Sequence, residues 1–161
     1  MKTHLKLRGN LLVAVFALLS LSVSGARADY VLPDIKHAPF GDVNVVVPIT
    51  SADPAIWSFR LHNIGNGTKV VSESGGTMKV KVVLYGAGIK MLIPPIDPKL
   101  KEAIDAARAA GAQFNVCNFS LKGMDLDWHN LYGVQESDIV PSGFAEVGWL
   151  GNHGWTVNAA N

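Results

Sequence analysis

The sequence predicts a single α/β domain built around a mainly parallel sheet, with helices on both faces. Three observations support this class. Short runs of β-branched and other apolar residues alternate with segments of helical periodicity along the chain. The length of 161 residues suits one ordinary domain with its own hydrophobic core. Hydrophobic residues make up 48% of the chain and charged residues 17%, which excludes a disordered or coiled-coil protein.

Residues 1–28 have the pattern of a secretory signal peptide. A basic start carries Lys2, Lys6 and Arg8, and an apolar run over residues 11–23 follows it. The run is shorter than the ~20 residues that a spanning helix needs, which favours cleavage over a retained membrane anchor. Ala26-Arg27-Ala28 then supplies the small residues of a cleavage site after Ala28. We therefore expect an exported, periplasmic protein.

The export signal accounts for the positive charge of the chain. The whole sequence has 14 basic and 13 acidic residues, a net charge of +1. Removing residues 1–28 takes away four basic residues and no acidic one, which leaves 10 against 13 and a net charge of −3. Nucleic-acid binding is not expected, because it usually requires a basic face. The single cysteine excludes an internal disulfide and a multi-thiolate metal site.

The first half of the domain is expected to contain a buried strand and then a helix. Residues 29–42 lack periodicity and are expected to form an irregular arm, ahead of a domain over residues 43–161. Residues 43–49 are rich in valine and predict a strand buried on both faces. Asp53-Pro54 is a helix start, and an apolar face follows at Trp57, Leu61 and Ile64. The glycines of Gly65-Asn66-Gly67 are expected to weaken or end this helix.

The next segments repeat the strand and helix pattern. Residues 78–85 predict a second strand, and Gly86-Ala87-Gly88 turns the chain into a short apolar segment over residues 89–93. Asp97-Pro98 opens the next helix, whose buried stripe is Leu100, Ile104 and Ala107 and whose end is marked by Gly111.

The last part of the chain is expected to complete a sheet of about five strands. Residues 114–117 and 138–140 predict short strands, with residues 120–132 helical in pieces between them. Ser142 is expected to cap a helix over residues 144–150, and residues 155–158 predict the last strand. In parallel sheets, ligands and chemistry collect beyond the carboxyl ends of the strands.

Cys117 is the strongest candidate for a functional residue. It is expected at the carboxyl end of the third strand, just before a helical segment. Amides at the start of a helix lower a thiol pKa and favour the nucleophilic thiolate. The alternative is an inert cysteine, because free cysteines are among the most buried residues. An unpaired thiol in an oxidising compartment favours function.

Other motifs predict no further catalytic or metal site. The Gly86–Gly88 turn lacks the third glycine of a dinucleotide-binding motif, although it could line a site shared with Cys117. Asp125, Asp127, His129 and Glu136 fit part of a calcium-loop frame, but Asn130 stands where the turn glycine is needed. No G-x-S-x-G motif supports a serine hydrolase. No metal or other cofactor is expected.

Several segments together resemble the DsrE/DsrF-like family of sulfur-relay proteins. They are Leu61-His62-Asn63-Ile64-Gly65-Asn66, residues 82–89 around the Gly86-Ala87-Gly88 turn, residues 111–121 around Cys117, and Val140-Pro141-Ser142-Gly143-Phe144-Ala145-Glu146. Their order and spacing agree with the family over about residues 43–158. The resemblance implies a three-layer α/β/α domain and homo-oligomers, commonly trimers or hexamers.

The resemblance also implies that Cys117 matches the family cysteine that carries a persulfide. The leading hypothesis is an exported sulfur carrier or sulfurtransferase that takes sulfur from a donor and passes it to an acceptor thiol. Asn118, Ser120 and the Gly86–Gly88 backbone would assist, with His62 and Asn63 as further candidates. The rivals are a non-catalytic oligomeric module that binds a small ligand, and a structural oligomer with a buried Cys117.

Overall fold

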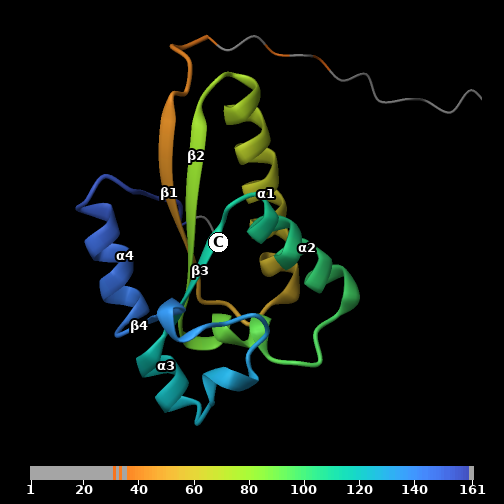
Figure 1. Cartoon of the computed structure of the whole chain (residues 1–161), viewed down its shortest axis with the longest axis vertical. Coiled ribbons are helices and arrows are strands. Elements are labelled where there is room, and N and C mark those ends of the chain that lie inside the picture. Colours follow the sequence, from red (N-terminus) through yellow and green to blue (C-terminus); the bar gives the residue numbers. More distant parts are fainter. Residues whose placement is uncertain (1–30, 32, 34–35, 160–161) are drawn as a thin grey trace, which may run out of the picture. The chain divides into compact units, whose positions relative to one another are not determined.

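A five-stranded parallel sheet forms the centre of the domain. The computed structural model describes residues 31, 33 and 36–159, so the expected signal peptide lies outside the described residues. The strand order is β4-β3-β2-β1-β5, and every pairing is parallel (Figure 1). The strands are β1 (Asp42–Ile49), β2 (Thr77–Leu84), β3 (Gln113–Cys117), β4 (Ile139–Val140) and β5 (Thr156–Val157).

Helices cover both faces of this sheet, as predicted, and give three α/β/α layers. Helices α1 (Pro54–Glu73) and α2 (Pro98–Ala109) lie together on one face, and α4 (Gly143–Gly151) lies on the other (Figure 1). Shorter segments lie between these elements: η1 (Gly86–Leu92), α3 (Asn118–Gly123), η2 (Trp128–Asn130) and η3 (Glu136–Asp138). No helix among the described residues is long and apolar enough to cross a membrane.

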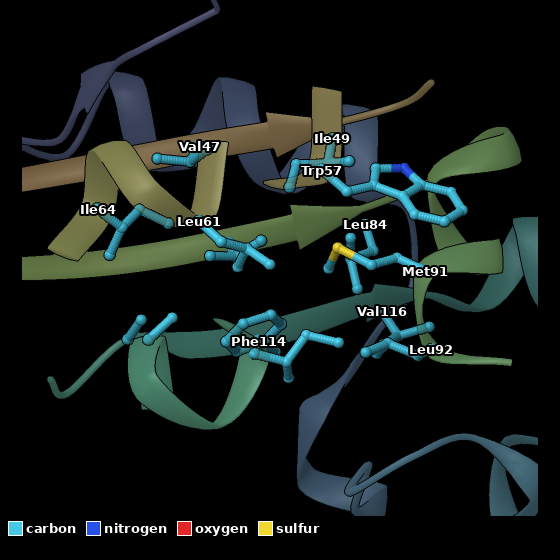
Figure 2. Close-up of a cluster of buried hydrophobic side chains, with 14 of the residues drawn as sticks. Val47, Ile49, Trp57, Leu61, Ile64, Leu84, Met91, Leu92, Phe114 and Val116 are labelled. Atoms are coloured by element: carbon cyan, nitrogen blue, oxygen red, sulfur yellow. The ribbon is translucent and has the colours of Figure 1, made fainter. Parts of the chain in front are cut away.

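The larger core lies between the sheet and the α1/α2 layer. Val45, Val47 and Ile49 point from alternate positions of β1 towards this layer, because successive side chains of a strand face opposite sides. Figure 2 shows side chains from α1, η1 and three strands packed together in this core. They include Trp57, Leu61, Ile64, Leu84, Met91, Leu92, Phe114 and Val116. The smaller core on the α4 face contains Val46, Val83 and Leu150.

Helix α1 is longer than the sequence predicts. Asp53 caps it by accepting a hydrogen bond from the Ala55 N–H at 2.9 Å, as expected. The expected end at Gly65-Asn66-Gly67 is wrong, because the helix continues to Glu73. Val71 lies two turns after Ile64 on the same face of the helix and is also buried. This packing outweighs the cost of glycine in a helix, about 1 kcal/mol per residue.

The two-residue strand β5 forms one edge of the sheet and leaves most of β1 unpaired on that side. It pairs only with Val45 and Val46, and the Asn158 N–H then donates to the Val46 carbonyl at 2.9 Å. Pro48 follows two residues later in β1. Arg60 of α1 secures this edge, because its guanidinium hydrogen-bonds to both the side chain and the carbonyl of Asn158. Arg60 is only 4% exposed, and burial lowers the pKa of its guanidinium.

Element boundaries otherwise agree with the predictions to within a few residues. Asp42 was expected to be the last residue of the arm over residues 29–42, but it is the first residue of β1. The second strand ends at Leu84, one residue before its expected end. The apolar segment after Gly86 is a 3₁₀ helix over Gly86–Leu92. Ser142 caps α4 by accepting from the Ala145 N–H at 3.3 Å, as predicted.

Candidate functional site

Cys117 is the last residue of β3 and lies at the carboxyl edge of the sheet. It pairs with Val140 of β4, and α3 begins at the next residue. Phe114 and Val116 of β3 pack in the α1/α2 core, so the alternation of the strand directs Cys117 to the α4 face. The cysteine is buried, with 3% of its surface exposed. The predicted position at a strand end is therefore confirmed, and the thiol is covered.

Polar groups around the sulfur offset this burial. Burial by itself raises the pKa of the Cys117 thiol and is the largest single effect. Hydrogen bonds from the Ser120 hydroxyl and from the backbone N–H groups of Gly143, Ser120 and Phe119 act in the opposite direction. Together they hold the pKa of Cys117 below its ordinary value. A cysteine in purely apolar surroundings would show the reverse shift.

Ser120 joins the cysteine to the glycine-containing turn after β2. Its hydroxyl oxygen accepts a hydrogen bond from the Gly86 N–H at 2.7 Å. The Ser120 proton is then left to donate to Cys117. Gly86 has a φ of 53°, a conformation that glycine adopts without strain. The structure thus brings together Cys117, Ser120 and Gly86, three of the residues that the sequence singles out.

Gly88 supports the same turn through close packing. A Cβ atom on Gly88 would collide with the backbone carbonyl of Ile49, at the end of β1. The absence of a side chain lets η1 lie directly on the strand ends. Gly88 is therefore a packing residue of the turn, and the Gly86 backbone is the part that contacts Ser120.

Gly143 is a site residue that sequence reasoning missed. It is the first residue of α4, and its N–H hydrogen-bonds to Cys117. A Cβ on Gly143 would lie 2.7 Å from the Cβ of Tyr85, so the helix start fits against the end of β2 only as glycine. The predicted Ser142 cap was the available signal, since it placed a helix start just after the fourth strand. The contact itself depends on how α4 crosses the sheet.

An open hollow of about 430 Å³ lies beside Ser120. It is lined by Gly86, Ala87, Lys90, Ser120, Gly123 and Met124. Lys90 is the only charged residue of this lining, and its side chain is exposed. The hollow reaches the serine that contacts Cys117, but the lining does not include the cysteine itself. A small anion in the hollow would lie next to the Ser120 hydroxyl.

Two exposed aromatic side chains belong to the helices that begin beside the cysteine. Phe119 in α3 is 71% exposed, and Phe144 in α4 is 77% exposed. The Phe119 N–H contacts Cys117 directly. Phe144 follows Gly143, whose N–H also contacts Cys117. Exposed apolar side chains mark a contact surface when they form a contiguous patch, whereas single ones are common on any protein. Trp149 of α4 is also exposed.

The remaining predicted site residues are placed apart from this hydrogen-bonded group or take no part in it. His62 and Asn63 lie on α1, which covers the opposite face of the sheet from Cys117. His62 lines a groove between α1 and α2, and Asn63 lines a small hollow near Arg60. The structure therefore does not bring them to the cysteine. Asn118 begins α3 and is half-buried, with no side-chain hydrogen bond to another described residue.

Two residues of the incomplete calcium-loop frame, Asp127 and His129, have a local structural role. Asp127 caps η2 by accepting from the His129 N–H at 3.0 Å, and its carboxylate also lies 2.6 Å from the His129 Nδ1. These hydrogen bonds lower the pKa of Asp127. Within the part of the chain that the structure describes, no three His, Cys, Asp or Glu side chains are grouped to hold a metal ion.

Comparison with known proteins extends the fold assignment but not the function. No family model matches the sequence. No curated protein matches it either. Among solved structures, the chain is similar to MTH1491, a protein of unknown function from Methanobacterium thermoautotrophicum. The TM-score is 0.64 at 21% sequence identity, over 74% of this chain and 100% of that one. This similarity supports the three-layer α/β/α fold alone.

Proposed function

We propose that the protein is an exported sulfur carrier or sulfurtransferase that holds sulfane sulfur as a persulfide on Cys117. One observation carries the proposal. The Cys117 sulfur lies among hydrogen-bond donors that hold its pKa below the ordinary value in spite of burial. Such donors stabilise an anionic sulfur, whether it is the thiolate or the terminal sulfur of a persulfide. The resemblance to sulfur-relay proteins supports the same chemistry.

The reaction needs no cofactor when thiosulfate is the donor. The Cys117 thiolate attacks the outer sulfur of thiosulfate, a bond forms between the two sulfurs, and sulfite leaves with the electron pair of the broken S–S bond. The product is the anionic persulfide of Cys117. An acceptor thiolate then attacks the outer sulfur of this persulfide, and the Cys117 thiolate leaves. Charge and atoms balance in both steps.

The local geometry suits the first step. Lys90 places one positive charge at the hollow beside Ser120, where an anionic donor would enter. The Ser120 hydroxyl is held by the Gly86 N–H and can donate to either sulfur of the persulfide. Burial of Cys117 would limit competing oxidation of the thiolate. Phe119 and Phe144 offer an apolar surface around the site for an acceptor protein or a further copy of the chain.

A second function has an observation in its favour. Cys117 is only 3% exposed, which agrees with a structural cysteine in a non-catalytic oligomeric module that binds a small ligand. In that case the hydrogen bonds to the sulfur only stabilise the starts of α3 and α4. The two functions differ in whether the sulfur can be reached and modified.

Intact-mass measurement after incubation with thiosulfate or polysulfide separates these functions. The sulfur-carrier proposal predicts the added mass of one sulfur atom, which a reductant removes and Cys117→Ala abolishes. Cys117 is the single cysteine of the chain, so the adduct has only one thiol on which to form. If the wild-type protein gains no sulfur while a known carrier does under the same conditions, the structural function stands instead.

Assembly and location belong to the same proposal. We infer a homo-oligomer, a trimer or hexamer, in which the exposed Phe119, Phe144 and Trp149 are covered. The pattern of residues 1–28 supports export to the periplasm and cleavage after Ala28. Light scattering of the purified protein gives the number of copies, and mass analysis of periplasmic protein gives the first residue.

A further inference from the structure

A second hollow, which differs in character from the one beside Ser120, lies along β3. Its volume is about 480 Å³, within the usual range for small-molecule sites. Its lining comes from β2, α2, β3 and the segment before β4 that includes η3. The lining includes the polar side chains of Lys81, Arg108, Gln113, Asn115, Ser137 and Asp138. We propose that this hollow binds a small hydroxylated organic acid.

The charges around the hollow favour an anion. Lys81 and Arg108 are the cations of the lining, and Asp138 is its one carboxylate. The Asp138 carboxylate already accepts a hydrogen bond from the Gln135 N–H at 2.9 Å, across one turn of its own loop. A positive excess therefore faces the hollow, and a carboxylate ligand would complement it.

Arg108 is held in place before any ligand binds. Its Nη2 donates to the carbonyls of Tyr132 at 3.0 Å and Gly133 at 3.1 Å. Its guanidinium carbon also lies 4.9 Å from the centroid of the Phe114 ring. No hydrogen bond from Nη1 to another described residue accompanies these contacts. A cation that is already fixed loses little conformational entropy when a ligand binds.

The neutral lining residues favour a ligand that carries hydroxyl groups. Gln113, Asn115, Gln135 and Ser137 place amides and a hydroxyl around the hollow. The Asn115 Nδ2 donates only to the Asp138 carbonyl, at 3.5 Å, the long limit for a hydrogen bond. The volume is larger than a simple ion needs, and the polar walls offer little to an apolar group. A hydroxylated carboxylate satisfies both the cations and the amides.

This inference does not depend on sulfur chemistry. Asn115 lies on β3 two residues before Cys117, and the lining does not include the cysteine. Gluconate, acetate and glucose together test the proposal, because gluconate combines the carboxylate of acetate with hydroxyls like those of glucose. When isotope-labelled protein is titrated with gluconate and followed by NMR, the backbone amide chemical shifts of Lys81, Gln113 and Asn115 should change saturably. We expect acetate and glucose to bind at least about tenfold more weakly.

Matched variants locate the binding. Lys81→Gln should weaken gluconate binding about tenfold. Lys79→Gln, which changes an exposed lysine of the same strand outside the lining, should leave it unchanged. Ser137→Ala, in η3, should weaken it about threefold and serves if Lys81→Gln does not fold. Equal binding of gluconate and acetate, equal effects of the two lysine variants, or shifts confined to other residues would each overturn the proposal, as would the absence of saturable shifts.

Discussion

The Ser120 hydroxyl and the Gly86 N–H are joined by a hydrogen bond of 2.7 Å, which links the start of α3 to the turn after β2. This contact fixes the oxygen of Ser120 as an acceptor, so its proton is directed to the Cys117 sulfur. One serine therefore connects the two segments that the sequence marks for function.

Ser120→Ala should raise the pKa of the Cys117 thiol, because it removes the foremost of the hydrogen bonds that oppose the burial effect. The rate of alkylation by iodoacetamide, followed by mass spectrometry across pH, reports the thiolate fraction. The midpoint should move to higher pH than in the wild type. Ser72→Ala, at an exposed position of α1, is the control. An unchanged midpoint in Ser120→Ala would show that the hydroxyl does not act on the sulfur.

The lowered thiol pKa also makes folding stability depend on pH. In the interval between the folded and unfolded pKa values, the unfolded thiol binds more protons than the folded one. The Cys117 contribution is therefore present in full above the ordinary thiol pKa of about 8.5 and is lost as the pH falls through the lower folded value. Urea denaturation of wild type and Cys117→Ala across this interval measures the difference. A difference that stays constant with pH would contradict the shift.

Gly143→Ala should destabilise the fold by about 1–3 kcal/mol, because the new Cβ would lie 2.7 Å from the Cβ of Tyr85. Gly148→Ala is the matched control in the same helix, since nothing lies within 4 Å of its added Cβ. The control should stabilise the protein by up to about 1 kcal/mol through helix propensity. Urea denaturation gives both values. Equal effects of the two changes would rule out tight packing of the α4 start against β2.

Asn158→Ala should destabilise the fold by about 1–3 kcal/mol, because it removes the side-chain partner of the buried Arg60 guanidinium. Asn66→Ala, at an exposed position of α1, should change stability by less than about 0.5 kcal/mol. The same denaturation measurement applies. If Asn158→Ala proves as mild as Asn66→Ala, Arg60 does not hold β5 through that side chain.

Gly65→Ala should stabilise the protein by about 1 kcal/mol, because α1 continues through this position and nothing lies within 4 Å of the added Cβ. Gly67→Ala should gain less, since its Cβ would lie 3.3 Å from the Met78 sulfur and the side chain would have to move. Thermal or urea denaturation ranks the two variants. Loss of stability in Gly65→Ala would mean that the helix is interrupted there in solution.

The sequence was sufficient for the strands and for the helix starts, because both depend on local chemistry. Valine-rich segments mark the buried strands, and Asp53, Asp97 and Ser142 cap their helices as expected. The end of α1 could not be predicted from its glycines, since the burial of Val71 beyond them is a tertiary effect. The approach of α4 to Tyr85 is likewise a matter of how distant elements pack.

The candidate site was predicted in part. Cys117, Ser120 and Gly86 meet because the ends of neighbouring parallel strands lie at one edge of the sheet. His62 and Asn63 were linked to Cys117 only by resemblance. They do not contact it, because α1 covers the opposite face of the sheet. The alternation of β3 contains this information, because Val116 packs under α1 and α2 and its neighbour must point away.

Pro48 limits the addition of a further strand to the edge of β1. The carbonyl of Val46 faces β5, so the backbone of Pro48, two residues later, faces the same side beyond the end of that strand. Proline has no N–H to offer a strand that tried to add there. A neighbouring molecule could not extend a continuous ladder along this side of β1. Pro48 therefore limits how far a strand of another copy could pair along this edge of the sheet.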